Sequence, residues 1–199
     1  TQIPQDFYEA LRETGTLHVI AASGYNVAIV ASVLMMILAK FATKKVSILM
    51  GITGIIFYIF ISGGTASVIR AGIMGSLTLI AYYFGRPAEA RRLLWVTIMI
   101  MLILSPLMIV DVSFQLSVMA TIGLLYIGGV VERFGDRLAV VAKLPSGMSI
   151  FLAEYLYPTL AATISTLPII LWHFGRISWI SPLVNMLILP FVPMIMLLT

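Results

Sequence analysis

The sequence of 199 residues contains no cysteine and few charged residues. Without cysteine, the chain can form neither disulfides nor thiolate metal sites. Charged residues make up 10% of the chain and hydrophobic residues 61%, whereas a soluble domain typically carries about 25% charged residues. So few charged side chains could not cover the core of a soluble enzyme, and the high hydrophobicity excludes intrinsic disorder. The composition therefore predicts an integral membrane protein.

Recognisable enzyme motifs are also missing. The chain has no Gly-x-Ser-x-Gly elbow, no phosphate-binding Walker loop and no His-Glu-x-x-His sequence. Its histidines, His18 and His173, stand too far apart to form a recognisable metal motif. We therefore expect no catalytic activity, no metal and no cofactor. Because the chain begins with Thr1 and an apolar run reaches Thr199, we also expect an excerpt of a larger protein, without a signal peptide.

Long hydrophobic runs are abundant. A helix needs about 20 apolar residues to cross the hydrocarbon layer, and the ten-residue alternation of membrane β-strands does not appear. Glycine, proline or charged residues separate the runs. The sequence therefore predicts an all-α polytopic bundle of about seven transmembrane helices, some broken or kinked. These runs cover residues 19–39, 46–62, 66–84, 93–110, 112–131, 149–172 and 177–198.

Residues 1–18 precede the predicted bundle (19–199) and have a different pattern. Ile3, Phe7 and Leu11 recur at helical spacing among charged residues. This spacing favours a short amphipathic lead-in helix, which lies on the outer membrane surface or packs on the bundle. The alternative is a polar lead-in to the first span.

The positions of lysine and arginine predict the orientation, because these residues are enriched in cytoplasmic loops. Nine of the twelve cations lie in the loops that follow the first, third and fifth spans. We expect these loops to face the cytoplasm and the N-terminal segment to lie outside. The nine cations are Lys40, Lys44, Lys45, Arg86, Arg91, Arg92, Arg133, Arg137 and Lys143.

Arg70 is the one cation inside a predicted span. A charge at the bilayer centre costs about 2.5–3.5 kcal/mol, so such residues usually face a cavity or a partner. Arg70 could be a structural cation paired with Asp111 or Glu154, or it could line a path for an anion. The spacing leaves both readings open.

Uncharged polar residues gather in the first, fifth and seventh spans. Ser113, Ser117 and Thr121 form a stripe on the fifth span, and Asp111 and Gln115 make a second polar pair there. Ordinary interhelical hydrogen bonding explains such residues, and so does a polar cavity between broken helices. Prolines in the last two runs predict broken or kinked helices. The residues concerned are His18, Ser23, Gly24 and Asn26 in the first span, Asn185 in the seventh, and Pro158, Pro168, Pro182, Pro190 and Pro193.

Four blocks of residues, in this order, resemble the transmembrane domain of the ComEC-type competence protein family. The match covers nearly the whole chain. The blocks are His18 with Ser23-Gly24-Tyr25-Asn26; Ser67-Val68-Ile69-Arg70-Ala71-Gly72-Ile73-Met74 with Gly85-Arg86; Ser105-Pro106 with Ser113-Phe114-Gln115-Leu116-Ser117-Val118-Met119-Ala120; and Thr166-Leu167-Pro168, Phe174-Gly175 and Ser181-Pro182-Leu183-Val184-Asn185 with Pro190. Thr65-Ala66 and Tyr25-Asn26 depart from common versions of the family pattern.

The resemblance implies a channel in the bacterial inner membrane that passes single-stranded DNA into the cytoplasm during natural transformation. It also implies other competence proteins as partners, such as a DNA receptor and a cytoplasmic motor. Whether one bundle or a homodimer forms the pore is left open. Family members often add an OB-like domain and a metallo-β-lactamase-like nuclease domain; the match includes neither, so no nuclease activity is implied.

The candidate residues of the DNA path follow from this resemblance. Arg70 would offset phosphate charge, and the other residues would donate hydrogen bonds or allow close approach, all around one cavity in the outer half of the bundle. A secondary transporter of a small anionic or polar solute is the alternative, and a membrane anchor for soluble domains is a third possibility. The candidates are Arg70, His18, Ser23, Gly24, Asn26, Gln115, Ser117 and Asn185.

Overall fold

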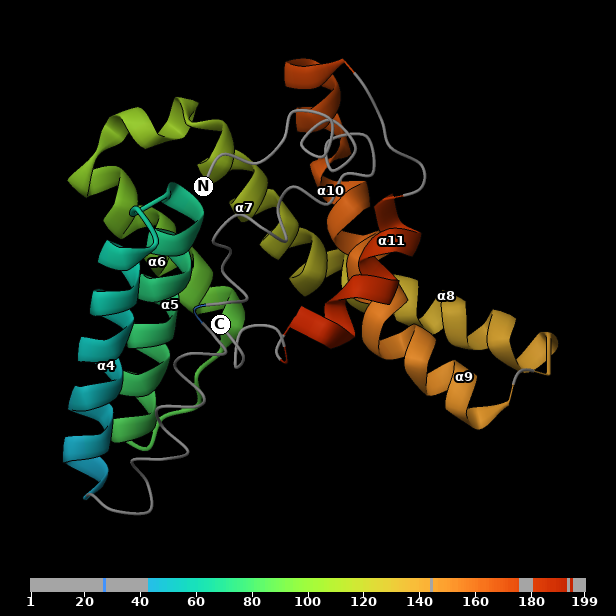
Figure 1. Ribbon diagram of the computed structural model, residues 1–199, viewed down its shortest axis with the longest axis horizontal. Coiled ribbons are helices and arrows are strands. Elements are labelled where there is room, and N and C mark those ends of the chain that lie inside the picture. The colour runs from blue at the N-terminus through green and yellow to red at the C-terminus, as the bar shows by residue number, and fades with distance from the viewer. Residues whose placement is uncertain (1–26, 28–42, 144, 176–180, 193, 195–199) are drawn as a thin grey trace. The chain divides into compact units, whose positions relative to one another are not determined.

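The computed structural model describes residues 27, 43–143, 145–175, 181–192 and 194. These residues form α-helices with short 3-10 and π segments, and no strand occurs among them (Figure 1). The predicted all-α class is therefore confirmed. The predicted lead-in helix (1–18) lies outside the described residues. The chain divides into two compact units, Ala22–Val118 and Thr1–Ala21 with Met119–Thr199, which are described separately.

Four helical segments of the described residues are long and apolar enough to cross a membrane. They support an α-helical membrane protein but not the predicted count of about seven spans. α6 (Ala90–Leu104) has 15 residues, which is about 22 Å of helix, because its apolar run is interrupted at Ser105. The four segments are Lys44–Ile61, Ala66–Tyr83, Val112–Val141 and Ser146–Phe174.

In the first unit, α4 (Lys44–Ile61) and α5 (Ala66–Tyr83) lie side by side (Figure 1). The turn between them contains Gly63 and Gly64, whose φ angles of 79° and 59° favour glycine. Val68 is buried in a cluster with Ile55 and with Val27, which belongs to the first predicted span. The start of α5 is therefore held in the core of this unit.

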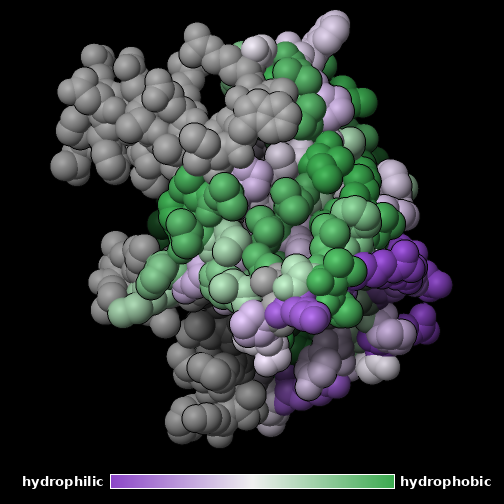
Figure 2. Space-filling model, turned by 90° about the vertical axis from the view of Figure 1, so that its right-hand side faces the viewer, coloured by the Kyte–Doolittle hydropathy of each residue, from purple (hydrophilic) through white to green (hydrophobic). Residues whose placement is uncertain are grey.

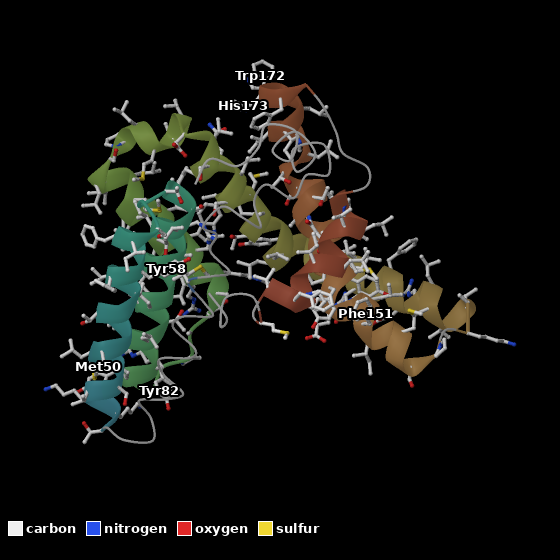
Figure 3. All side chains as sticks on the ribbon, in the orientation of Figure 1. Met50, Tyr58, Tyr82, Phe151, Trp172 and His173 are labelled. Carbon is white, nitrogen blue, oxygen red and sulfur yellow. The ribbon has the colours of Figure 1, made fainter. Side chains whose placement is uncertain are left out.

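The opposite end of the α4–α5 pair holds a cation against an aromatic ring. Lys44 Nζ lies 4.5 Å from the centroid of the Tyr82 ring and donates a hydrogen bond of 3.4 Å to the Tyr83 carbonyl. Figure 3 shows Tyr82 at this end of the pair. The loops that precede α4 and follow α5 thus meet at one end, as the distribution of cations predicts.

Two short segments connect α6 with α7 (Val112–Ile122). Ser105 is extended because it precedes Pro106, and the chain then makes a 3-10 turn, η1 (Pro106–Val110). Asp111 Oδ1 accepts a hydrogen bond of 2.7 Å from the Phe114 backbone N–H, which is the geometry of a helix N-cap. The start of α7 is therefore fixed by its own sequence.

In the second unit, two long helical arms each contain a π segment. α7 continues through η2 (Gly123–Ile127) into α8 (Gly128–Val141). The other arm runs from α9 (Ser146–Phe151) through η3 (Leu152–Leu156) into α10 (Tyr157–Phe174). The fifth loop was expected after residue 131, and the structure corrects this expectation: the helix continues to Val141. α10 ends at Gly175, whose φ of 62° suits a glycine cap.

Two glycines bring these arms together. A Cβ on Gly123 would lie 2.5 Å from the Ala161 carbonyl oxygen and would clash with Ser165 Oγ. A Cβ on Gly135 would clash with the ring of Tyr157. η2 and α8 therefore pack closely on α10 because these positions have no side chain.

The prolines have different effects from those predicted. Pro168 lies inside α10 without ending it, and Pro158 lies in the first turn of that helix. The expectation of a broken sixth span is therefore wrong for the backbone described here, since the helix runs unbroken from Ser146 to Phe174. In the seventh predicted span, α11 (Ser181–Ile188) is followed by a 3-10 turn, Leu189–Phe191, that contains Pro190.

Candidate functional site

The candidate site is centred on Arg70, one turn into α5. Residues two apart on a helix point about 200° apart, so Arg70 lies away from the core face on which Val68 is buried. Its side chain is nevertheless only 9% exposed. Gly72 faces Ile55 and Ile59 of α4, where a Cβ would clash. α5 thus uses one face for packing on α4 and another for the buried cation.

The guanidinium of Arg70 is held by uncharged groups. Its Nε donates a hydrogen bond of 2.8 Å to Ser117 Oγ on α7, and its Nη1 lies 3.8 Å from Met74 Sδ. A thioether is a weak acceptor, and an arginine side chain has five N–H donors. Most of these donors therefore have no strong acceptor among the described residues of this unit.

The bond places Arg70 and Ser117 at the same depth. Arg70 lies about 6 Å along α5 from its first residue, and Ser117 about 7.5 Å along α7. Both helices therefore begin at the same end of this unit. The intervening α6, although short, carries the chain back between them, as the predicted order of crossings requires.

No carboxylate in the described part of residues 22–118 forms an ion pair with Arg70. The expected pairing with Asp111 is therefore wrong: that carboxylate caps α7 through the Phe114 N–H. Glu154 belongs to the other unit, so pairing with it stays a prediction. The arginine in this site is consequently held by neutral hydrogen-bond acceptors on its own unit.

Gln115 is engaged locally. Its Nε2 donates a hydrogen bond of 2.8 Å to the Ile109 carbonyl in η1, and its side chain is exposed. The predicted polar pair of Asp111 and Gln115 is therefore incorrect, because each side chain binds backbone at the start of α7. The Ser113–Ser117–Thr121 stripe contributes Ser117 to the site.

The remaining candidates are not brought to Arg70. Asn185 is buried on α11 in the other unit, and its convergence with Arg70 stays a prediction. His18, Ser23, Gly24 and Asn26 lie outside the described residues. Of the eight candidates, the structure joins Arg70 and Ser117.

Met74 is a site residue that the sequence reasoning did not single out. It lies four residues after Arg70 on the same helix face. That spacing was the available signal, but methionine in an apolar run usually indicates packing alone. Its contact positions the guanidinium from the side opposite to its backbone attachment.

These observations define an α-helical membrane protein with an arginine buried between two of its helices. Comparison with known families identifies it further: the Competence protein family model matches residues 1–199. The chain belongs to this family, and the resemblance seen in the residues is confirmed. It is 24% identical over 191 residues to ComE operon protein 3 of Bacillus subtilis (strain 168), covering 95% of this chain and 23% of that relative. No solved structure matches.

Proposed function

We propose that this chain forms part of the path by which single-stranded DNA crosses the inner membrane into the cytoplasm during competence. The observation that carries the proposal is the buried Arg70 guanidinium, bound by Ser117 and Met74 instead of a carboxylate. Family membership supports it. The proposal concerns passage of a strand and involves no catalytic step by this chain.

The electrostatics favour an anionic occupant. A strand carries one phosphate per nucleotide, and phosphate is excluded from hydrocarbon unless a cation offsets its charge. An arginine already neutralised by a carboxylate would attract phosphate weakly, whereas Arg70 keeps its full charge within its unit. Its bond to Ser117 fixes the guanidinium plane, so that the remaining N–H donors can approach phosphate oxygens in pairs.

The contacts of the site suit movement as well as attraction. One cation with neutral neighbours binds each phosphate weakly and without regard to base sequence, so that successive phosphates can replace one another. We further propose that the cation-rich loops face the cytoplasm. The meeting of Lys44 with Tyr82 and Tyr83 supports this, since it brings the first and third loops to one end of the helix pair.

The test compares Arg70→Gln with Arg70→Lys and with Arg86→Gln, which removes an exposed cation outside the site. Cells that depend on this protein for competence are assayed for DNA that has become resistant to external nuclease, for transformation frequency and for the amount of inserted protein. We expect Arg70→Gln to abolish uptake at unchanged protein level, Arg70→Lys to retain part of it, and Arg86→Gln to be normal.

Two outcomes contradict the proposal. Normal transformation by Arg70→Gln would exclude a role for the guanidinium in the path. Loss of folded protein in Arg70→Gln, with normal uptake per molecule that remains, would make Arg70 a purely structural cation. Flux of a small anion through the reconstituted chain, without passage of labelled oligonucleotides, would favour the transporter alternative.

A further inference from the structure

The end of the α8–α9 hairpin carries a surface that the proposed DNA path does not use. The arm Val112–Val141 has 30 residues and the arm Ser146–Phe174 has 29. Each is therefore about 44–45 Å long, against a hydrocarbon layer of about 30 Å. The hydrophobic run of the first arm ends at residue 131, so the excess length lies at the hairpin end. About 15 Å of α8 should project past the hydrocarbon.

This projecting part exposes a row of apolar side chains. Val130, Phe134, Leu138 and Val141 follow one another at helical spacing, and each is more than half exposed. We call these four residues the α8 stripe. The opposite side of α8 is covered, because Gly135 lies against the Tyr157 ring and Ala139 is buried. Packing on α10 therefore turns the stripe outward.

The charged residues of α8 are divided by sign around this stripe. At about 100° per residue, Arg137 and Arg133 lie about 20° and 60° from Val130 on the helix circumference. Glu132 and Asp136 lie at least about 120° from every stripe residue by the same geometry. All four charged side chains are exposed. The stripe is therefore bordered by cations and separated from the carboxylates.

Figure 2 views the molecule from the side on which α8 and α9 lie in Figure 1. Hydrophilic side chains gather there beside a hydrophobic area. Exposed Met148 and Ile150 extend the apolar surface onto the neighbouring arm. The two arms thus present apolar and cationic surface together, at the level where they leave the hydrocarbon.

We propose that this face of α8 lies on the anionic headgroup layer of the membrane. The α8 stripe enters the boundary between headgroups and acyl chains, while Arg133 and Arg137 reach lipid phosphates. Such an arrangement, with cations beside an apolar face, is typical of interfacial helices on negatively charged lipid. The continuity of α8 with a membrane-crossing helix places the stripe at that layer, which favours lipid over a protein as its occupant.

The test exploits the absence of cysteine from the whole sequence. The full chain carrying Leu138→Cys is labelled with an environment-sensitive fluorophore and reconstituted in phosphatidylcholine vesicles, with or without phosphatidylglycerol. We expect blue-shifted emission and quenching by lipids brominated on the acyl chain, both stronger with phosphatidylglycerol. The same label at Asp136→Cys should report water in either vesicle.

Charge variants separate lipid recognition from simple burial. Arg133→Gln with Arg137→Gln should abolish the difference between the two vesicles at the Leu138 label, whereas Glu132→Gln with Asp136→Asn should retain it. Circular dichroism of each reconstituted variant confirms that its helices are formed. A Leu138 label exposed to water in both vesicles would overturn the proposal and favour a protein partner. Equal burial in both vesicles would overturn the role of anionic headgroups.

Discussion

Arg70 on α5 and Ser117 on α7 are joined by one hydrogen bond, although 47 residues separate them in the sequence. α5 packs closely on α4 and α6, so the long arginine side chain provides a direct link from α5 to α7. The bond fixes the cation at the level where both helices begin. It also accounts for the position of a charged residue in a hydrophobic run without an ion pair on its own unit.

The first prediction concerns this bond. Ser117→Ala should reduce DNA uptake while the protein still inserts, because Arg70 loses the acceptor that orients it. A loss of about 1–3 kcal/mol in unfolding free energy is expected, as for a buried donor left unpaired. Ser117→Thr should retain function. Ser113→Ala, one turn earlier on the same stripe, is the matched control; equal defects at both positions would contradict a specific role for Ser117.

The second prediction concerns Asp111. Since its carboxylate caps α7, Asp111→Ala should destabilise the protein by about 1 kcal/mol, whereas Asp111→Asn should be nearly neutral because asparagine caps equally well. Combining Asp111→Asn with Arg70→Gln should leave uptake as low as in the single Arg70 variant. Thermal unfolding in detergent and transformation frequency measure the two effects. Restored uptake in the double variant would reveal a charge pair between these residues.

The third prediction concerns Gly135. Gly135→Ala should destabilise the protein by about 1–3 kcal/mol, because the added methyl group would meet the Tyr157 ring in a closely packed contact. Gly129→Ala on the same helix meets nothing within 4 Å and should be neutral or stabilising by up to about 1 kcal/mol. Thermal unfolding in detergent compares them. Tyr157→Ala added to Gly135→Ala should relieve the clash; if the added change deepens the defect, the contact is not its cause.

The fourth prediction concerns Gly123. Gly123→Ala should be more damaging than Gly135→Ala, since its methyl group meets the Ala161 carbonyl as well as the Ser165 side chain, and backbone cannot rotate away. Adding Ser165→Ala should rescue stability only in part. Gly128→Ala, where a Cβ would have an ordinary 4.0 Å contact, is the control. Full rescue by Ser165→Ala would show that the backbone contact is unimportant.

Much of the fold could be predicted from the sequence because the bilayer imposes a simple rule on apolar runs. The runs 46–62 and 66–84 correspond to α4 and α5 within about two residues at each end. Run 93–110 was misjudged, since hydropathy does not register the extended residue before Pro106. The loop expected after residue 131 was misjudged for another reason: charged residues indicate exposure to water, but α8 is exposed and helical at once.

For the candidate site, the sequence determined that Arg70 stands out, because charge inside a hydrophobic run is costly wherever the helix lies. It could not decide the partner of that charge. Asp111 was the electrostatically obvious choice, yet its local hydrogen bond to Phe114 N–H forms within one helical turn and needs no other helix. Only the tertiary structure brings Ser117 and Met74 to the guanidinium, because such contacts depend on which helix faces pack together.

The scarcity of charge and the length of the apolar runs thus determined membrane insertion and helical structure by themselves, through the cost of burying charge and unpaired backbone groups in hydrocarbon. Whether a given polar residue binds its own backbone, a neighbouring helix or a ligand was decided by tertiary packing. Gly123 and Gly135 illustrate the difference: in the sequence they are ordinary small residues, and in the structure they set the approach of one helical arm to the other.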